Sequence, residues 1–198
     1  MLLENKTVRV MRTFLGDLES YRHGSRIAKK LDMNQKTVSN ILNRLEEENL
    51  LKSRRDGKNK QFSVDFADPE KTLRYILLCE TAATIMFLDK NPKIKDIIGK
   101  IRPFMKGVVV VFGSYAKGIQ RKNSDLDILV AGTCNKNRIR EISEMYDIDI
   151  SVKTLNEKSF ITALKRRDIL MKEIISNHIL ISGSDSYVQN VVRYYYGR

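Results

Sequence analysis

The chain has 198 residues, of which 42% are hydrophobic, enough for one ordinary domain or two small ones with buried cores. This composition excludes fully disordered, collagen-like and disulfide-scaffold proteins. The 36 basic and 24 acidic residues give a formal net charge of +12. Such a charge favours polyanionic partners, namely nucleic acids or nucleotide phosphates.

Cysteine usage and hydropathy indicate a cytoplasmic protein. The two cysteines and two histidines are scattered and form no CxxC pair, so we expect neither a disulfide framework nor a zinc site. The N-terminal residues lack the apolar core of a signal peptide. The most apolar stretch, residues 73–88, contains charged residues and is too short to span a bilayer.

Hydrophobic periodicity divides the chain into three parts. Residues 1–66 contain the pattern of three short amphipathic helices followed by a hairpin. Residues 67–104 predict a helical linker of two segments that begin near Pro69 and Pro92. Residues 105–198 contain the apolar runs VVVVF, DLDILV, DIDISV and ILIS, which are typical of strands. We therefore predict an α+β protein whose C-terminal α/β domain has a small mixed sheet.

The third predicted helix of the N-terminal part, Gln35 to about Asn49, has an unusual polar face. Asn34 is a suitable N-cap, and the apolar positions of the helix follow the spacing of a core-facing stripe. The residues directed outward are rich in amides, which can hydrogen-bond base edges in a major groove. The candidate DNA-binding residues of this helix are Gln35, Lys36, Ser39, Asn40 and Asn43.

A basic hairpin follows that helix. LLKSRR and KQFSVDF flank a turn at residues 56–59, and the concentration of cations predicts a phosphate clamp that includes Arg54, Arg55 and Lys58. The segment SRIAKKLDMNQKTVSNILNRLEEENLLKSRRDGKNKQFSV resembles the winged helix-turn-helix of bacterial and archaeal transcription regulators. The resemblance implies that the helix enters the major groove and the hairpin is the wing. The alternative is a winged helix used only for protein contacts.

The C-terminal part contains a glycine and carboxylate constellation. A predicted buried strand, VVVVF, leads into Gly113 and Ser114, where the backbone can approach a phosphate closely. After ten intervening residues come Asp125 and Asp127, whose side chains project from one face of a strand, roughly 6 to 7 Å apart. Two such carboxylates repel each other unless a cation lies between them, and Mg²⁺ prefers hard oxygen ligands left open to phosphates.

A third carboxylate is expected from a neighbouring strand, DIDISV at residues 147–152. Its isoleucines and valine predict the buried face, which places Asp147, Asp149 and Ser151 together on the other face. Asp149, between two isoleucines, is the better candidate, whereas Asp147 is nearer the strand start.

The spacing Gly113-Ser114, ten residues, Asp125-x-Asp127 resembles the signature of minimal nucleotidyltransferases of the DNA polymerase β superfamily, and the similarity extends over about residues 91–185. The resemblance implies two Mg²⁺ ions held by Asp125, Asp127 and Asp149, and a nucleoside triphosphate whose phosphates meet Gly113 and Ser114. It also implies transfer of a nucleoside monophosphate with release of pyrophosphate, with Asp149 as general base.

The resemblance implies AMP transfer from ATP, or the equivalent from another NTP, to a protein or small molecule, and a regulatory or antitoxin-type role. A HEPN-type toxin is the protein acceptor suggested by the family. We also expect that the chain can form a homodimer. The rival hypothesis is a transcription regulator whose transferase fold only senses nucleotide. An RNA-directed transferase is a weaker third hypothesis. Tyr194, Tyr195 and Tyr196 are either acceptors or part of a packing or mobile tail.

Overall fold

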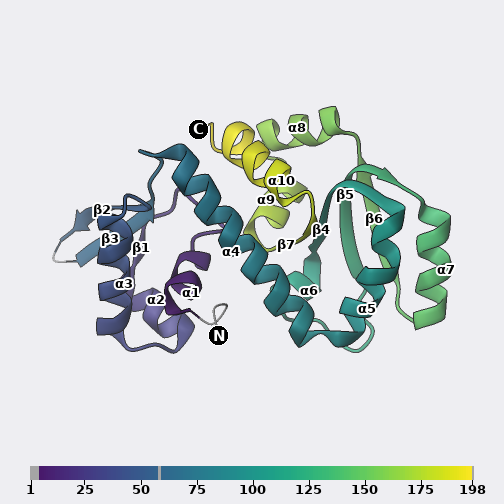
Figure 1. Cartoon of the computed structure of the whole chain (residues 1–198), viewed down its shortest axis with the longest axis horizontal. Helices are drawn as coiled ribbons and strands as arrows, with labels where there is room; N and C mark the ends of the chain where they lie inside the picture. Colours follow the sequence, from purple (N-terminus) through teal and green to yellow (C-terminus); the bar gives the residue numbers. More distant parts are fainter. Residues whose placement is uncertain (1–4, 58, 198) are drawn as a thin grey trace. The chain divides into compact units, whose positions relative to one another are not determined.

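The computed structural model describes residues 5–57 and 59–197 (Figure 1). The chain divides into two compact units, Met1–Ala82 and Ala83–Arg198. The boundary falls inside helix α4 (Pro69–Lys90) and therefore within the stretch predicted as a helical linker. Helix α4 thus contributes residues to both units.

In the described part of the first unit, three helices and a small antiparallel sheet precede α4. The sheet has the strand order β1-β3-β2, so the predicted hairpin is extended by one short strand. Its elements are α1 (Lys6–Arg12), β1 (Arg22–His23), α2 (Gly24–Leu31), α3 (Gln35–Glu47), β2 (Leu51–Asp56) and β3 (Asn59–Val64).

Helix α3 forms where the capping and apolar patterns predict it. The Asn34 side chain accepts hydrogen bonds from the backbone amides of Lys36, at 2.9 Å, and Thr37, at 3.3 Å, which satisfies donors left open at the helix start. The side chains of Val38, Leu42 and Leu45 are buried. This buried stripe leaves the amide-rich face exposed.

The second unit is built on a four-stranded mixed sheet. The order is β6-β5-β4-β7, with β5 and β6 parallel and the other two pairs antiparallel. The strands are β4 (Met105–Phe112), β5 (Leu126–Cys134), β6 (Ile150–Leu155) and β7 (Ile179–Ser182). The helices are α5 (Pro92–Ile101), η2 (Arg102–Phe104), α6 (Gly113–Lys117), α7 (Lys136–Tyr146), α8 (Glu157–Arg166), α9 (Ile169–Ser176), α10 (Ser184–Asn190) and η3 (Val191–Tyr195).

One face of this sheet packs against α5 and α7. The core cluster joins alternate residues of β4 and β5, among them Val109 and Ile128, to isoleucines of both helices. Helix α5 is therefore part of the core of the second unit. The opposite face carries Val108, Val110 and Leu129, which are also buried, and α8 and α10 contact the strands. The predicted α+β class and the small mixed sheet are confirmed.

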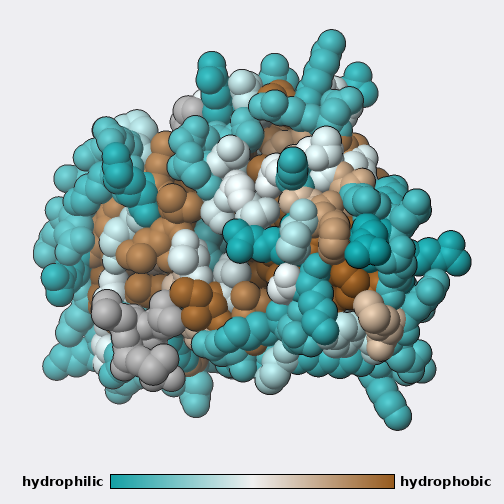
Figure 2. Space-filling view, turned by 45° about the vertical axis from the view of Figure 1, so that its right-hand side comes forward, coloured by the Kyte–Doolittle hydropathy of each residue, from teal (hydrophilic) through white to brown (hydrophobic). Residues whose placement is uncertain are grey.

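Hydrophilic side chains stand out from the face drawn in Figure 2, with hydrophobic residues set between them. No helix in the described part of the chain is long and apolar enough to cross a membrane.

Candidate active site

The starts of the parallel strands β5 and β6 bring the candidate carboxylates to one edge of the sheet. The register pairs Leu126 with Ile150, and the Leu126 amide donates to the Asp149 carbonyl at 2.8 Å. Asp125 therefore lies beside Asp149, each directly before its strand. Because Leu126 and Ile128 pack on the core face and strand side chains alternate, Asp127 belongs to the opposite face. Asp125 and Asp149 are exposed in the loops just before their strands.

The structure corrects the placement of Asp147. This residue is not on a strand but is the C-cap of α7, in the left-handed conformation with φ 47°. The strand β6 begins only at Ile150. The period-2 pattern of DIDISV therefore extends too far toward the N-terminus. Asp147 and Asp149 both precede the strand, so they do not share a strand face with Ser151 as predicted.

Gly113 lies close to the Asp127 carboxylate. It follows β4, whose last residue, Phe112, pairs with Asp127. Gly113 has φ +70°, and a Cβ atom placed on it would lie 2.2 Å from Oδ2 of Asp127. Only glycine allows both this conformation and this approach. Ser114, half-buried, follows in the first turn of the short helix α6.

The electrostatic environment of Asp127 joins four elements. Burial raises the pKa of Asp127 above its ordinary value, and the charge of Asp125 raises it further. Lys153 of β6 and Lys117 of α6 lower this pKa, whereas Glu173 of α9 raises it. Lys117 and Glu173 also form an ion pair with an Nζ–Oε1 distance of 2.7 Å.

Two of these residues were missed by the sequence analysis. Lys153 pairs with Leu129 in the parallel register, so strand alternation places it on the same face of the sheet as Asp127. The alternation of residues 149–153 could have identified it from the sequence. Glu173 comes from a helix near the end of the domain, and no local pattern identifies it. Lys117 is the last residue of α6, the short helix that begins at Gly113.

The carboxylates are suited to a cation that keeps open coordination positions. Among the residues that the structure describes, no hydrogen bond or ion pair engages the carboxylate of Asp125, Asp127 or Asp149. Within the same residues, no group of three or more His, Cys, Asp or Glu side chains is gathered as a ready metal site. A Mg²⁺ site needs only one or two carboxylates when substrate phosphates supply the other ligands, and Asp125 with Asp127 meet this requirement.

A polar pocket of about 320 Å³ opens beside these strand starts. It is lined by Asp149 and by residues of the two loops that precede β5 and β6. The remaining lining residues are Lys122, Asn123, Ser124, Asp147 and Ile148. The pocket therefore places a carboxylate next to space for a polar molecule.

The candidate DNA-binding residues of α3 are exposed, and three of them border a second polar pocket, of about 290 Å³. These three are Gln35, Ser39 and Asn43. Asn43 Oδ1 accepts a hydrogen bond from Lys60 Nζ at 3.4 Å, and Lys60 also pairs with Glu46. Lys36 and Asn40 are exposed on the same helix.

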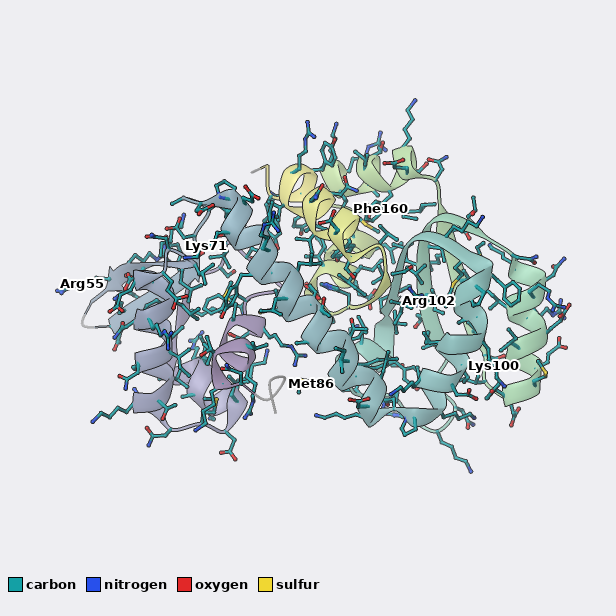
Figure 3. The ribbon with its side chains drawn as sticks, viewed as in Figure 1. Arg55, Lys71, Met86, Lys100, Arg102 and Phe160 are labelled. Carbon is teal, nitrogen blue, oxygen red and sulfur yellow. The ribbon has the colours of Figure 1, made fainter. Side chains whose placement is uncertain are left out.

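The wing cations differ in their surroundings. The Arg54 guanidinium lies 4.1 Å from the centre of the Tyr21 ring, and its Nε donates to Gln61 at 3.1 Å. Arg55 is exposed, and Figure 3 shows its side chain pointing away from the hairpin. Lys58 lies outside the described residues.

Comparison with known proteins identifies the fold of the second unit. Residues 93–187 match the family described as "Polymerase beta, Nucleotidyltransferase". This stretch contains Gly113, Ser114 and the three candidate aspartates, and the match supports a nucleotidyltransferase domain over residues 93–187. No significant match was found among curated protein sequences.

Two solved structures are also similar to part of the chain. The first is a toxin–antitoxin complex with AMP-PNP, at 21% identity and a TM-score of 0.34. The second is a mutant of the toxin–antitoxin MntA-HpeT, at 20% identity and a TM-score of 0.32. Each match covers 52% of this chain and 82% of the other.

The close approach of Gly113 to Asp127 predicts the effect of adding one methyl group. Gly118 provides a matched control, because its φ is +69° and nothing lies within 4 Å of the added Cβ. Alanine at either position should cost about 1–2 kcal/mol of unfolding free energy through its positive φ. Only Gly113→Ala should displace the Asp127 carboxylate and weaken Mg²⁺-dependent binding of a triphosphate. Urea unfolding and calorimetric titration measure the two effects, and equal binding by both variants would contradict the role of Gly113.

Proposed function

We propose that the chain is a Mg²⁺-dependent nucleotidyltransferase that transfers AMP from ATP to a protein or small-molecule acceptor. The carrying observation is the approach of the Asp127 carboxylate to Gly113, beside Asp125 and at the end of β4. This arrangement combines a glycine turn that admits phosphate with two carboxylates that admit a cation. The family match of residues 93–187 supports the same reaction class.

In the proposed site, Asp125 and Asp127 hold the metal, and Gly113 and Ser114 contact the triphosphate. Bound Mg²⁺ would stabilise the charge on the phosphates and lower the pKa of an attacking hydroxyl. The acceptor oxygen forms a bond to the α-phosphorus, the bond from that phosphorus to the bridging oxygen breaks, and pyrophosphate leaves. Asp149 takes the proton of the acceptor hydroxyl.

Lys117 and Lys153 have a supporting part in this proposal. Both act electrostatically on Asp127, so both are close enough to attract the phosphates that would share the metal with it. Glu173 holds the Lys117 ammonium by an ion pair and thereby limits its movement. The resemblance suggests a protein acceptor of the HEPN type. A homodimer is a separate proposal.

Removal of the Asp149 charge should separate binding from chemistry. Asp149→Asn should keep affinity for Mg²⁺ and a non-hydrolysable triphosphate but slow transfer by about 10²- to 10⁴-fold, the range for a general base. Asp147→Asn is the control, because Asp147 lies in the same pocket but at the end of α7, and its transfer rate should stay unchanged.

Labelled triphosphate incubated with cell lysate provides the transfer assay. Transfer undiminished in Asp149→Asn would contradict the base assignment. Wild-type protein that transfers nothing, while nucleotide changes its DNA affinity, would establish the alternative of a nucleotide-sensing regulator.

We further propose that the first unit is a winged helix that binds DNA. Helix α3 presents exposed amides, and the hairpin of β2 and β3 presents Arg55 to solvent. Asparagine and glutamine can pair with adenine in the major groove, and arginine at the hairpin can contact phosphates. The DNA-binding unit would direct the transferase, or its sensing function, to a genomic site.

The two kinds of contact predict different defects. Arg55→Ala should weaken binding to all duplexes alike, since phosphate contacts carry no sequence information. It should also reduce the salt slope, which is the slope of log affinity against log salt concentration, by about 1. Asn40→Ala should lose about 1–3 kcal/mol of discrimination among sites selected from a random duplex pool. Arg74→Ala removes an equal charge from α4 and serves as control. If the Arg55→Ala variant kept the full salt slope, the hairpin would not be the element that contacts the phosphates.

A further inference from the structure

The C-terminal helix η3 and the end of α8 form a surface in which cations lie over tyrosine rings. Lys165 Nζ and the Arg193 guanidinium lie 5.1 and 5.3 Å from the centre of the Tyr194 ring. The Arg167 guanidinium lies 4.9 Å from the centre of the Tyr195 ring. We call these five residues the basic–aromatic patch. The contact of η3 with α8 is seen in Figure 1, where the end of the chain lies beside α8.

The cations of the patch differ from those of α7, another surface helix of the second unit. On α7, Arg138 and Arg140 pair with glutamates at 2.6 and 3.2 Å. Among the residues that the structure describes, no ion pair engages Lys165, Arg167 or Arg193. The positive charge of the patch is therefore not neutralised by carboxylates of the described chain.

The backbone of the patch is irregular in a way that positions these side chains. Helix η3 is a π-helix, a form that is rare and frequent at functional sites. Arg167 ends α8 in the left-handed conformation, with φ 49°, where glycine or asparagine is usual. Its Nε donates to the Tyr195 carbonyl at 3.0 Å. This hydrogen bond ties the end of α8 to η3 and fixes the guanidinium beside the ring.

We propose that the basic–aromatic patch binds single-stranded nucleic acid. Aromatic rings interleaved with cations are the means by which proteins stack bases and neutralise the backbone of a single strand. A base stacked on tyrosine gains more than an exposed cation over the same ring. A base can therefore displace Lys165 or Arg193 from Tyr194, and the released cation is then available to a phosphate. Duplex DNA offers no free base faces and is not the expected ligand.

The patch lies in the same unit as the proposed active site. Helix α9 begins two residues after Arg167, and its first residue, Ile169, is 87% exposed. Glu173, which acts on Asp127, follows one helical turn later on the same side of α9. The binding proposal does not depend on transfer, so its test contains no triphosphate.

The test compares oligothymidylate with an abasic oligonucleotide of equal length and charge, by fluorescence anisotropy on the full chain. The wild type should bind oligothymidylate about 5- to 150-fold more tightly, the range for one stacked base. Tyr194→Leu should lose this preference and Tyr194→Phe should keep it. Thermal melting shows whether each variant is folded. If leucine disturbs the packing, Tyr194→Phe still tests the role of the ring, because it keeps the ring in place.

Charge is tested separately from stacking. Arg167→Gln with Arg193→Gln should reduce the salt slope for oligothymidylate by about 1.4, since each phosphate contact contributes about 0.7 for single strands. The matched pair Arg138→Gln with Arg140→Gln should leave the slope unchanged. Equal binding of the abasic strand, or equal competition by polyglutamate, would overturn the proposal in favour of an acidic protein partner.

Discussion

The geometry of the candidate site is constrained by the Asp127 carboxylate, which lies against Gly113 with no room for a Cβ atom between them. The strands β4 and β5 are antiparallel neighbours over their full length, ending at the pair Phe112 and Asp127. The chain must therefore leave β4 in a conformation that allows the carboxylate to occupy the turn. The position of this side chain is set by the register of a buried sheet, and the Gly113 turn lies next to it.

This arrangement opposes stability. The raised pKa of Asp127 means that the folded chain holds its ionised form less favourably than water does, because the carboxylate is partly buried and lies close to Asp125. For an acid whose pKa is higher in the folded state, the free energy of unfolding falls as the pH rises from the ordinary pKa to the raised one. It stays lower above that range. A cation bound between Asp125 and Asp127 would offset this cost. A strained charge pair at a glycine turn is therefore expected of a ligand site rather than of a structural one.

The strands and the helix α3 were predictable because their signals are local. Apolar runs predicted β4, β5 and β7. The spacing of Val38, Leu42 and Leu45 predicted which face of α3 is exposed. Asp147 was misplaced because alternation alone does not show where a strand begins. Aspartate tolerates the left-handed conformation that ends α7. The place of Glu173 beside Lys117 and Asp127 depends on how α9 packs, which no local pattern encodes. The roles of the site residues stay predictions.

Thermal unfolding of Asp127→Asn tests the central claim most directly. At neutral pH without Mg²⁺, the variant should melt at a higher temperature than the wild type, because it lacks the unfavourable charge. Mg²⁺ with a non-hydrolysable triphosphate should raise the melting temperature of the wild type and leave that of the variant unchanged. A variant that is less stable than the wild type, yet gains as much from Mg²⁺ and triphosphate, would contradict a metal site built on Asp127.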